Sequence, residues 1–357
     1  MRLRHLVARG FRNLADLDCE PPASGLVLLG PNAQGKTNLL EALYYPVLFR
    51  SFRGAPDHEV TRFEGPGFHL EADVDGGLAA SVGASYASAG RRKRILVDGQ
   101  EPERLADAVG AWLAVSFLPD DVSLAAGSAA GRRAYLDRLL SLADRHYLRS
   151  LSRYRGALAQ RNSALRQGRW EVARAFDAPL AAAGAGIIAR REQWAEGAAG
   201  QFAAEFECLG EGGGARLEYR TGPELADPAA WDAALAAAWS RDQGRAMTTV
   251  GPHRDDLVLA VAGKPLREFG SNGQQRAAAV ALKLIELAAL REARGTEPAL
   301  LLDDVFAAFD RERQRRLARR LLEIPGRQVF LTAPRPDELP PDLALPVWHV
   351  EAGKVTP

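Results

Sequence analysis

The sequence predicts an α/β protein with a head of mixed sheets and helices, built from both ends of the chain, and an inserted, mainly helical arm. Three observations favour this fold class. A glycine-rich loop at residues 30–37 joins an apolar strand to an amphipathic helix. Near the other end of the chain, an apolar strand at residues 300–302 ends in two aspartates. Between them, residues 128–204 are rich in Ala, Leu and Arg and contain few helix breakers.

The N-terminal part of the head, expected at residues 1–120, begins with strands. Apolar residues alternate in Leu3–Val7 and Leu14–Cys19, and the apolar run Gly25–Leu29 leads directly into the glycine-rich loop. Helical spacing follows over Asn38–Leu48. Further short strands are predicted over residues 68–74, 78–86 and 95–97, the last before an Asp-Gly turn.

The arm is expected at residues 121–245 and the C-terminal part of the head at residues 246–357. Two or more long helices fit residues 128–204, and an antiparallel hairpin is one arrangement for them. After the arm, the pattern predicts a strand at 257–261, a helix at 274–293, a strand at 300–303, a basic helix and a last strand at 328–332 before a proline-rich end.

Composition narrows the class of protein. The 357 residues are 47% hydrophobic and 25% charged, which is ordinary for a folded soluble protein. No apolar run approaches the ~20 residues of a membrane span, and the first residues lack the apolar core of a signal peptide. Cys19 and Cys208 lie far apart in sequence, so we expect no disulfide framework and a cytoplasmic location.

Charge is unevenly distributed, although the net charge is only +1. Residues 131–170 hold ten arginines and two aspartates, a charge of +8, whereas residues 171–245 hold seven arginines and twelve acids, a charge of −5. Smaller basic blocks lie at residues 91–94 and 311–320. This asymmetry leaves two interpretations open: a surface for a polyanion, or solvated helix faces in an arginine-rich protein.

The glycine-rich loop reads GPNAQGKT and matches the phosphate-binding pattern G-x-x-x-x-G-K-[ST] at every constrained position. Its backbone N–H groups can form a nest for phosphate at a helix N-terminus, while Lys36 reaches the β- and γ-phosphates and Thr37 ligates Mg²⁺. The predicted nucleotide-binding residues are Gly30, Pro31, Asn32, Ala33, Gln34, Gly35, Lys36 and Thr37. A chance glycine-rich turn is the alternative, and the flanking strand and helix argue against it.

Two aspartates follow the apolar run at residues 300–302. Ligands of open α/β sheets bind at the carboxyl ends of strands, so Asp303 is predicted to hold Mg²⁺ and Asp304 to polarise the attacking water. Lys36 and Asp304 are therefore the candidate catalytic residues. Taken alone, the acidic pair could instead cap the next helix.

The helix before this strand opens with FGSNGQQR at residues 269–276, and its core, Ser-x-Gly-Gln, is similar to the signature of ABC-type ATPases. In that class the serine and the helix N-terminus contact a nucleotide held by the partner subunit. The resemblance implies an ABC-type head, ATP as cofactor, contacts from Ser271, Gly273 and Gln274, and a two-fold homodimer that encloses two ATP molecules. An ordinary N-cap by Ser271 is the alternative.

Other positions can be compared with the ABC class. Ala307–Asp310 occupies the place of the loop that crosses the dimer interface in that class. Thr332 ends the last predicted strand, where many ABC transporters have histidine. No glutamine occurs between Gln34 and Gln100, so the residue that couples the arm to the γ-phosphate stays open.

A longer series of motifs resembles bacterial RecF, a family of recombination mediators, over residues 3–335. The motifs are, in order, Phe11-Arg12-Asn13, GPNAQGKTN, Arg50-Ser51-Phe52-Arg53, Phe117-Leu118-Pro119-Asp120-Asp121, Arg132-Arg133, Leu136-Asp137, Tyr154, Gln160-Arg161-Asn162, GPHRDD at residues 251–256, SNGQQR at residues 271–276 and Leu302-Asp303-Asp304-Val305. GPHRDD and Gln-Arg-Asn are more specific than the phosphate loop. Asn272 and Ala307-Ala308 depart from the family pattern at positions that bear on the dimer interface.

The resemblance implies an ABC/SMC-like head without a long coiled coil, in a protein that binds DNA and dimerises with ATP. It implies action with RecO and RecR at gaps and junctions between single- and double-stranded DNA, in repair, replication restart and the SOS response. Hydrolysis would be weak and regulatory. The resemblance also adds Asn13 to the nucleotide-binding residues.

The basic part of the arm is consistent with duplex binding. A dimer would bring two +8 segments together, and arginine–phosphate contacts are independent of sequence and sensitive to salt. The candidate DNA-binding residues are Arg145, Arg149 and Arg153. No aromatic series is arranged for base stacking, which favours duplex over single-stranded DNA.

Three other functions are weighed against this one. The inserted arm, the missing histidine at position 332 and the arginine-rich stretch argue against an ABC transport cassette. A nuclease fusion would need an acidic cluster that the sequence lacks after Asp310. An ABC/SMC-type ATPase whose arm docks partner proteins, with DNA contacted only by those partners, stays open.

Overall fold

The computed structural model describes residues 1–222, 225–306, 311–322, 324, 326–339 and 343–357. It consists of two compact units, one formed by Met1–Asp120 with Glu286–Pro357 and the other by Asp121–Ile285. The inserted unit extends farther than residue 245, the end expected from the sequence. Strand β9 (Asp256–Val261) pairs with β8 (Ala215–Arg220), and this pairing holds the residues after 245 in the inserted unit.

A six-stranded sheet in the first unit carries the glycine-rich loop. Its strand order is β14-β13-β3-β12-β11-β7, and all neighbours are parallel except β13 and β14. The strands are β3 (Gly25–Leu29), β7 (Ala114–Phe117), β11 (Ala299–Leu302), β12 (Val329–Ala333), β13 (Val347–Glu351) and β14 (Lys354–Thr356). The central strands are apolar runs because a parallel sheet is covered on both faces.

An antiparallel sheet of order β2-β1-β4-β5-β6 forms the other layer of this unit. Its strands are β1 (Arg2–Arg9), β2 (Leu17–Cys19), β4 (Gly67–Asp75), β5 (Ser81–Ala87) and β6 (Arg92–Val97). Buried and more exposed residues alternate along β4, as expected for a sheet with one covered face. The predicted Asp-Gly turn ends β6, with φ of 51° at Asp98 and 75° at Gly99.

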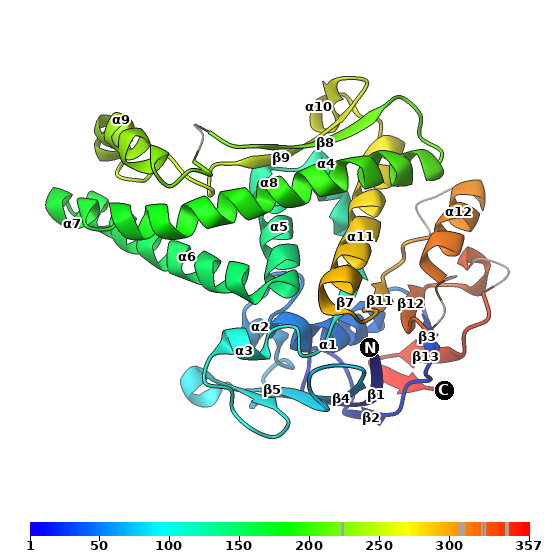
Figure 1. Cartoon of the computed structure of the whole chain (residues 1–357). Helices are drawn as coiled ribbons and strands as arrows, with labels where there is room; N and C mark the ends of the chain where they lie inside the picture. Colours follow the sequence, from blue (N-terminus) through cyan, green and yellow to red (C-terminus); the bar gives the residue numbers. More distant parts are fainter. Residues whose placement is uncertain (223–224, 307–310, 323, 325, 340–342) are drawn as a thin grey trace. The chain divides into compact units, whose positions relative to one another are not determined.

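Helix α1 (Lys36–Leu48) lies between the two sheets, since it contacts β4 and β5 of one and β7, β11 and β12 of the other (Figure 1). Most of its residues are buried, and the Trp112 indole donates a 2.9 Å hydrogen bond to the Leu43 carbonyl. A helix apolar on nearly all sides is typical of such a position. The unit also contains α2 (Asp57–Val60), α3 (Leu105–Ala108) and α12 (Arg311–Leu322).

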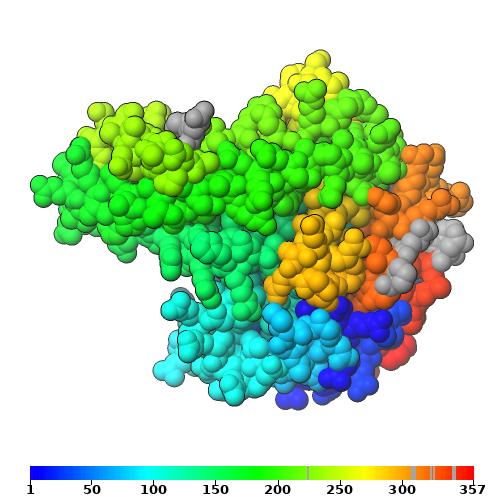
Figure 2. Space-filling model, viewed as in Figure 1, coloured from blue at the N-terminus to red at the C-terminus, as the bar shows by residue number. Residues whose placement is uncertain are grey.

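The sequence analysis did not predict the hairpin of β13 and β14, because a proline-rich segment precedes it. Val347–Glu351 pairs with β3 in parallel, so the chain's last strands lie against one of its first. Figure 2 shows the red surface of these residues beside the blue surface of the N-terminal segment.

The second unit is mainly helical, as predicted. Helices α6 (Arg145–Arg166) and α8 (Asp177–Cys208) lie side by side, joined through α7 (Trp170–Arg174) (Figure 1). A three-stranded sheet of order β10-β9-β8 completes the unit. The remaining elements are α4 (Ser123–Ala126), α5 (Ala129–Ala143), α9 (Ala230–Arg245), β10 (Lys264–Pro265), α10 (Leu266–Phe269) and α11 (Asn272–Arg294), whose last residues belong to the first unit.

By length and composition alone, the helical stretch Trp170–Cys208 could cross a membrane. In the structure α8 packs against α6, β8 and α9 and buries side chains such as Ile187, Ile188 and Phe202 among them. The buried Arg191 on the same helix makes hydrogen bonds within the unit. One face of α8 is therefore buried within the second unit.

Candidate nucleotide-binding site

The site forms where three neighbouring parallel strands end. β12 lies between β3 and β11, so the loop after β3, the end of β12 and the acids after β11 meet at one sheet edge. Ligands of such sheets bind at this edge. Asp303 is therefore brought to Thr37, the neighbour of Lys36, although 266 positions separate Asp303 from Thr37 in sequence.

Two residues of the glycine-rich loop have a left-handed backbone conformation. Ala33 and Gly35 have φ of 65° and 113°, and a left-handed conformation of this kind favours glycine. A Cβ at Gly30 would lie 2.2 Å from the Val350 carbonyl oxygen, so only glycine allows this close approach. The loop then leads into α1, whose free N–H groups and positive end suit an anion.

The Lys36 ammonium group crosses the loop. Its side chain is buried, and Nζ donates to the carbonyl oxygens of Gly30 at 2.6 Å and Pro31 at 3.0 Å. An ammonium has three hydrogens, so these two bonds leave one donor for an anion. The role of Lys36 toward the phosphates stays a prediction.

The Asp303 carboxylate lies between two threonine hydroxyls. Thr37 Oγ1 donates to it at 2.9 Å, and Thr332 Oγ1 lies 2.8 Å from its Oδ1. Burial raises the pKa of Asp303; the hydroxyls of Thr332 and Thr37 oppose the shift, and the nearby Asp304 adds to it. Hydroxyl and carboxylate oxygens are donors that Mg²⁺ prefers, so Thr37 and Asp303 fit the predicted metal role.

Thr332 also positions Asp304. The Asp304 backbone N–H donates to Thr332 Oγ1 at 2.9 Å, and this hydroxyl lies 3.1 Å from Asp304 Oδ1. Asp304 has a φ of 47°, an uncommon conformation for a residue other than glycine. The threonine at the end of β12 therefore holds both acids, a contact that depends on strand order.

A second polar group surrounds the start of α1. Asn38 Nδ2 donates to Asn13 Oδ1 at 2.7 Å, and Arg53 Nη1 donates to Asn38 Oδ1 at 3.0 Å. The fully buried Glu41 accepts two hydrogen bonds from Arg12, at 2.9 and 2.8 Å, and one from Ser51. Sequence reasoning missed Glu41, which holds two of the resemblance motifs together.

A cavity of about 780 Å³ opens beside Asn13 and Asn38. The segment from His58 to Gly65 lines its other side, and the Phe63 side chain there is 89% exposed. An exposed aromatic ring at a cavity with polar amides can stack on a planar group. Phe63 carried no signal in the sequence, because it belongs to no motif.

The β13–β14 turn supports the loop from behind. Gln34 Oε1 accepts from the Ala352 N–H at 2.6 Å, and the Gln34 carbonyl accepts from the Gly353 N–H at 2.8 Å. A Cβ at Gly353 would lie 1.9 Å from the Asn13 carbonyl oxygen. This turn is thus fitted against both Gln34 and Asn13.

In the second unit, Ser271 caps helix α11. Its Oγ accepts from the Gln274 N–H at 3.2 Å, and Gln274 Oε1 accepts from the Ser271 N–H at 3.0 Å. This reciprocal pair is a capping box, the alternative considered for this serine. A role of Ser271, Gly273 and Gln274 toward a nucleotide stays a prediction. Ala307–Asp310, the expected crossing loop, lies outside the described residues.

The chain resembles known proteins over its whole length. No protein-family model matches it. The DNA replication and repair protein RecF of Anaeromyxobacter sp. (strain Fw109-5) is 39% identical over 372 residues, which cover 100% of this chain and 99% of the relative. This chain belongs to the RecF family.

Solved structures agree with this membership. The recombination mediator protein RecF-ATPrS of the RecFOR pathway matches with a TM-score of 0.86 at 29% identity, covering 99% of this chain and 97% of that one. An Smc head bound to the C-winged helix domain of ScpA matches with a TM-score of 0.57 at 16% identity and shows the fold alone. The predicted α/β fold of the ABC/SMC class is confirmed.

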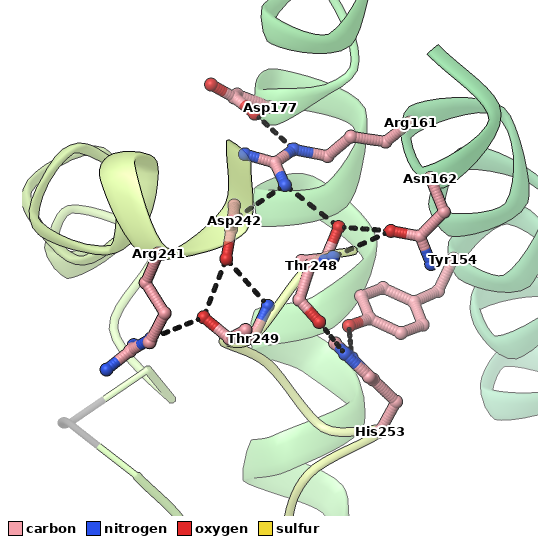
Figure 3. A network of polar contacts seen from close by, with 9 residues as sticks. All are labelled: Tyr154, Arg161, Asn162, Asp177, Arg241, Asp242, Thr248, Thr249 and His253. Atoms are coloured by element: carbon pink, nitrogen blue, oxygen red, sulfur yellow. Dashed lines mark hydrogen bonds and ion pairs between the residues drawn. The ribbon is translucent and has the colours of Figure 1, made fainter. Parts of the chain in front are cut away.

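Two RecF-like motifs meet in a buried polar network of the second unit (Figure 3). Arg161 of the Gln-Arg-Asn motif is fully buried and donates to Asp242 at 2.7 Å and to Thr248 at 2.8 Å. Asn162 accepts from the Thr248 N–H at 2.7 Å. The neighbouring hydroxyl satisfies part of this buried ion pair, whereas Arg161 Nη2 is buried without a hydrogen-bond partner in the described part of the chain.

The loop of the GPHRDD motif packs on the same helix. Tyr154 and His253 share a 2.6 Å hydrogen bond, and a Cβ at Gly251 would lie 2.4 Å from the Tyr154 hydroxyl (Figure 3). Arg132 binds both carboxylate oxygens of Asp256 at 2.8 Å. The motif's described contacts are therefore structural ones within the second unit.

The three candidate DNA-binding arginines lie on α6. Arg145, Arg149 and Arg153 are exposed and four residues apart, so they share one face of the helix. Their role toward DNA stays a prediction.

Proposed function

We propose that this RecF-family protein is an ATP-dependent, DNA-binding recombination mediator. The observation that carries the proposal is the convergence of Lys36, Thr37 and Asp303 at adjacent strand ends. Family membership over the full chain supports the repair role, and the similarity to a solved structure of RecF with ATP supports the nucleotide.

ATP would occupy the glycine-rich loop. The β- and γ-phosphates would meet the loop N–H groups and the free hydrogen of Lys36. The cavity beside Asn13, with the Phe63 ring at its wall, is suited to the base and sugar. Thr37 and Asp303, whose side chains lie 2.9 Å apart, would hold Mg²⁺ together with phosphate oxygens and water.

Hydrolysis would be weak and serve to reset the protein. The bound metal would neutralise charge that develops on the phosphates. Thr332 orients Asp304, whose carboxylate is the candidate to polarise the attacking water.

ATP is proposed to drive dimerisation through the helix N-terminus at Ser271, which would face the partner's nucleotide. A ligand shared by two subunits stabilises the dimer by mass action. The dimer would bind duplex DNA near gaps and junctions with single strands, act with RecO and RecR, and support repair, replication restart and the SOS response in the cytoplasm.

The decisive experiment measures oligomeric state and duplex binding with and without ATP and Mg²⁺. We expect ATP to promote both. Lys36→Met should lose ATP binding, about tenfold or more in affinity, because a charge-assisted hydrogen bond is removed. Ser271→Ala should keep ATP binding but lose ATP-dependent dimerisation. Normal dimerisation of the Ser271→Ala variant would contradict the proposed enclosure of ATP.

Ser271 also caps α11, so its loss can weaken the helix itself. Ser271→Asp keeps the cap and places a negative charge where phosphate would approach. This variant should fold normally and still fail to dimerise with ATP.

A further inference from the structure

A cavity of about 290 Å³ lies within the second unit, among α5, α6, α8 and the loop of the GPHRDD motif. No role is assigned to it by the proposed ATP cycle. Its polar and charged lining side chains are Arg133, Asp137, Tyr154, Arg155, Arg191 and His253.

The lining carries an excess of positive charge. Three guanidinium groups face one carboxylate, and that carboxylate, Asp137, already accepts from Arg191 at 2.7 Å and from Arg155 at 2.8 Å. His253 adds no compensating charge. Its Nε2–H donates to the Thr248 carbonyl at 3.0 Å, so its Nδ1 accepts from Tyr154, as in a neutral ring (Figure 3).

Arg133 is the least compensated of these groups. It is half-buried, and its Nη1 donates a hydrogen bond to the Asp255 backbone carbonyl at 2.6 Å. The side chain of Asp255 accepts from Tyr219, and that of Asp256 pairs with Arg132. Burial and the nearby Arg191 lower the pKa of Arg133, and the Asp256 and Asp255 carboxylates oppose this shift only in part.

We propose that this cavity binds a phosphate group, either as free inorganic phosphate or as a phosphate of DNA. Forked guanidinium groups match phosphate oxygens, and the excess of positive charge among the lining side chains suits an anion. The volume is at the lower edge of the ~300–1,000 Å³ of small-molecule sites, which fits a phosphate group better than a whole nucleotide.

The cavity has a half-buried and an exposed arginine with distinct roles. Arg133 presents its remaining guanidinium hydrogens from the half-buried side. The Arg155 side chain is 57% exposed, so it can meet a ligand that enters from solvent. The Tyr154 hydroxyl can accept from a protonated phosphate, since its own hydrogen is donated to His253.

The test is a titration of inorganic phosphate, at constant ionic strength, into the full-length Lys36→Met variant without ATP. That substitution lowers the affinity of the glycine-rich loop for phosphate, so the loop contributes little to the measured binding. Calorimetry measures the binding of phosphate, and the NMR signal of the His253 ring reports whether the cavity is occupied. We expect saturable binding with a shift of the His253 signal, and at least a tenfold weaker affinity after Arg133→Gln or Arg155→Gln.

Arg166→Gln is the matched control, since Arg166 is exposed on α6 and does not line the cavity. It should leave the affinity unchanged. If Arg133→Gln does not fold, Arg155→Gln decides alone, because its side chain is mostly in solvent. Absence of saturable binding, or equal affinity in the Arg155→Gln and Arg166→Gln proteins, would overturn the proposal.

A competition arm distinguishes the two sources of phosphate. A short duplex that displaces inorganic phosphate from the cavity identifies DNA as the ligand, and a 5′-hydroxyl duplex shows whether a terminal phosphate is needed. Phosphate binding that the duplex does not displace identifies the free anion. Because ATP is absent, failure here leaves the ATP-dependent function untouched.

Discussion

At the scale of single residues, Asp303 shows how burial and function oppose each other. Its folded-state pKa is raised, chiefly by burial. A raised pKa means that the folded protein holds the proton more tightly than the unfolded chain. The contribution of Asp303 to stability is therefore fully present below the unfolded pKa of about 3.9 and is lost as pH rises through the folded pKa. Above the folded pKa, the buried carboxylate makes the nucleotide-free protein less stable than an uncharged group at this position would.

Asp303→Asn should raise the melting temperature of the nucleotide-free protein at neutral pH, by about 1–2 °C for each kcal/mol gained. The amide carries no charge, and the threonine hydroxyls can rotate to accept from it. The same variant should lose the stabilisation that Mg²⁺ with ATP gives the parent protein. Thermal unfolding with and without Mg²⁺ and ATP measures both effects, and an unchanged response to Mg²⁺ would contradict the assignment of the metal ligand.

Local motifs revealed part of this site, and the rest depends on strand order. The glycine-rich loop, Lys36 and Asp303 could be predicted because each lies in a short pattern next to a strand. Thr332 could be assigned a position but no partner, since its contact with two acids requires β12 to lie beside β11. Glu41 and Phe63 carried no pattern at all.

At the scale of elements, the β13–β14 turn is part of the phosphate loop's support. Gly353→Ala should reduce ATP affinity and stability, because its Cβ would overlap the Asn13 carbonyl oxygen and its φ is 79°. Gly99→Ala is the control, since its φ is 75° and no atom lies within 4 Å of its Cβ. The Gly99→Ala variant should lose about 1–2 kcal/mol of unfolding free energy, because alanine is strained in the left-handed conformation. Its affinity for ATP should not change. Equal ATP affinities in the two variants would argue against a supporting role.

Helix α8 contains a second matched pair of glycines. A Cβ at Gly184 would lie 2.3 Å from the Trp231 ring, whereas no atom lies within 4 Å at Gly186. Gly184→Ala should destabilise the protein by about 1–3 kcal/mol through overpacking. Gly186→Ala should stabilise it by about 0.5–1 kcal/mol, because alanine favours the helix. Chemical denaturation measures both, and a stable Gly184→Ala protein would show that α8 and α9 do not pack tightly here.

The elements that sequence reasoning recovered are those with strong periodicity or a flanking motif, such as α1, α11 and β3. β13 and β14 were missed because they are short and follow prolines. The second boundary was placed too early because the 3.6-residue periodicity ends with α9, although β9 returns to pair with β8.

At the scale of the whole molecule, the charge on α6 should determine how DNA binding responds to salt. We expect the triple substitution of Arg145, Arg149 and Arg153 by Ala to make the slope of log K against log salt less negative. The change should be about 0.9 for each phosphate contact removed. The matched control replaces Arg311, Arg315 and Arg319, which are exposed with the same spacing on α12. Filter binding to duplex DNA over a salt series, with ATP, measures the slopes. Unchanged slopes in the α6 variant would favour an arm that docks proteins instead of DNA.

The pairing of β3 with β12 and β13 also orders events during synthesis. The ribosome makes β3 and the glycine-rich loop long before Val329–Ala333 and Val347–Glu351, which flank β3 in the sheet. Asp303 and Thr332 also follow the loop late in the chain. A nascent chain therefore cannot assemble this phosphate site until these later strands have been made, which would keep chains that lack them from engaging nucleotide.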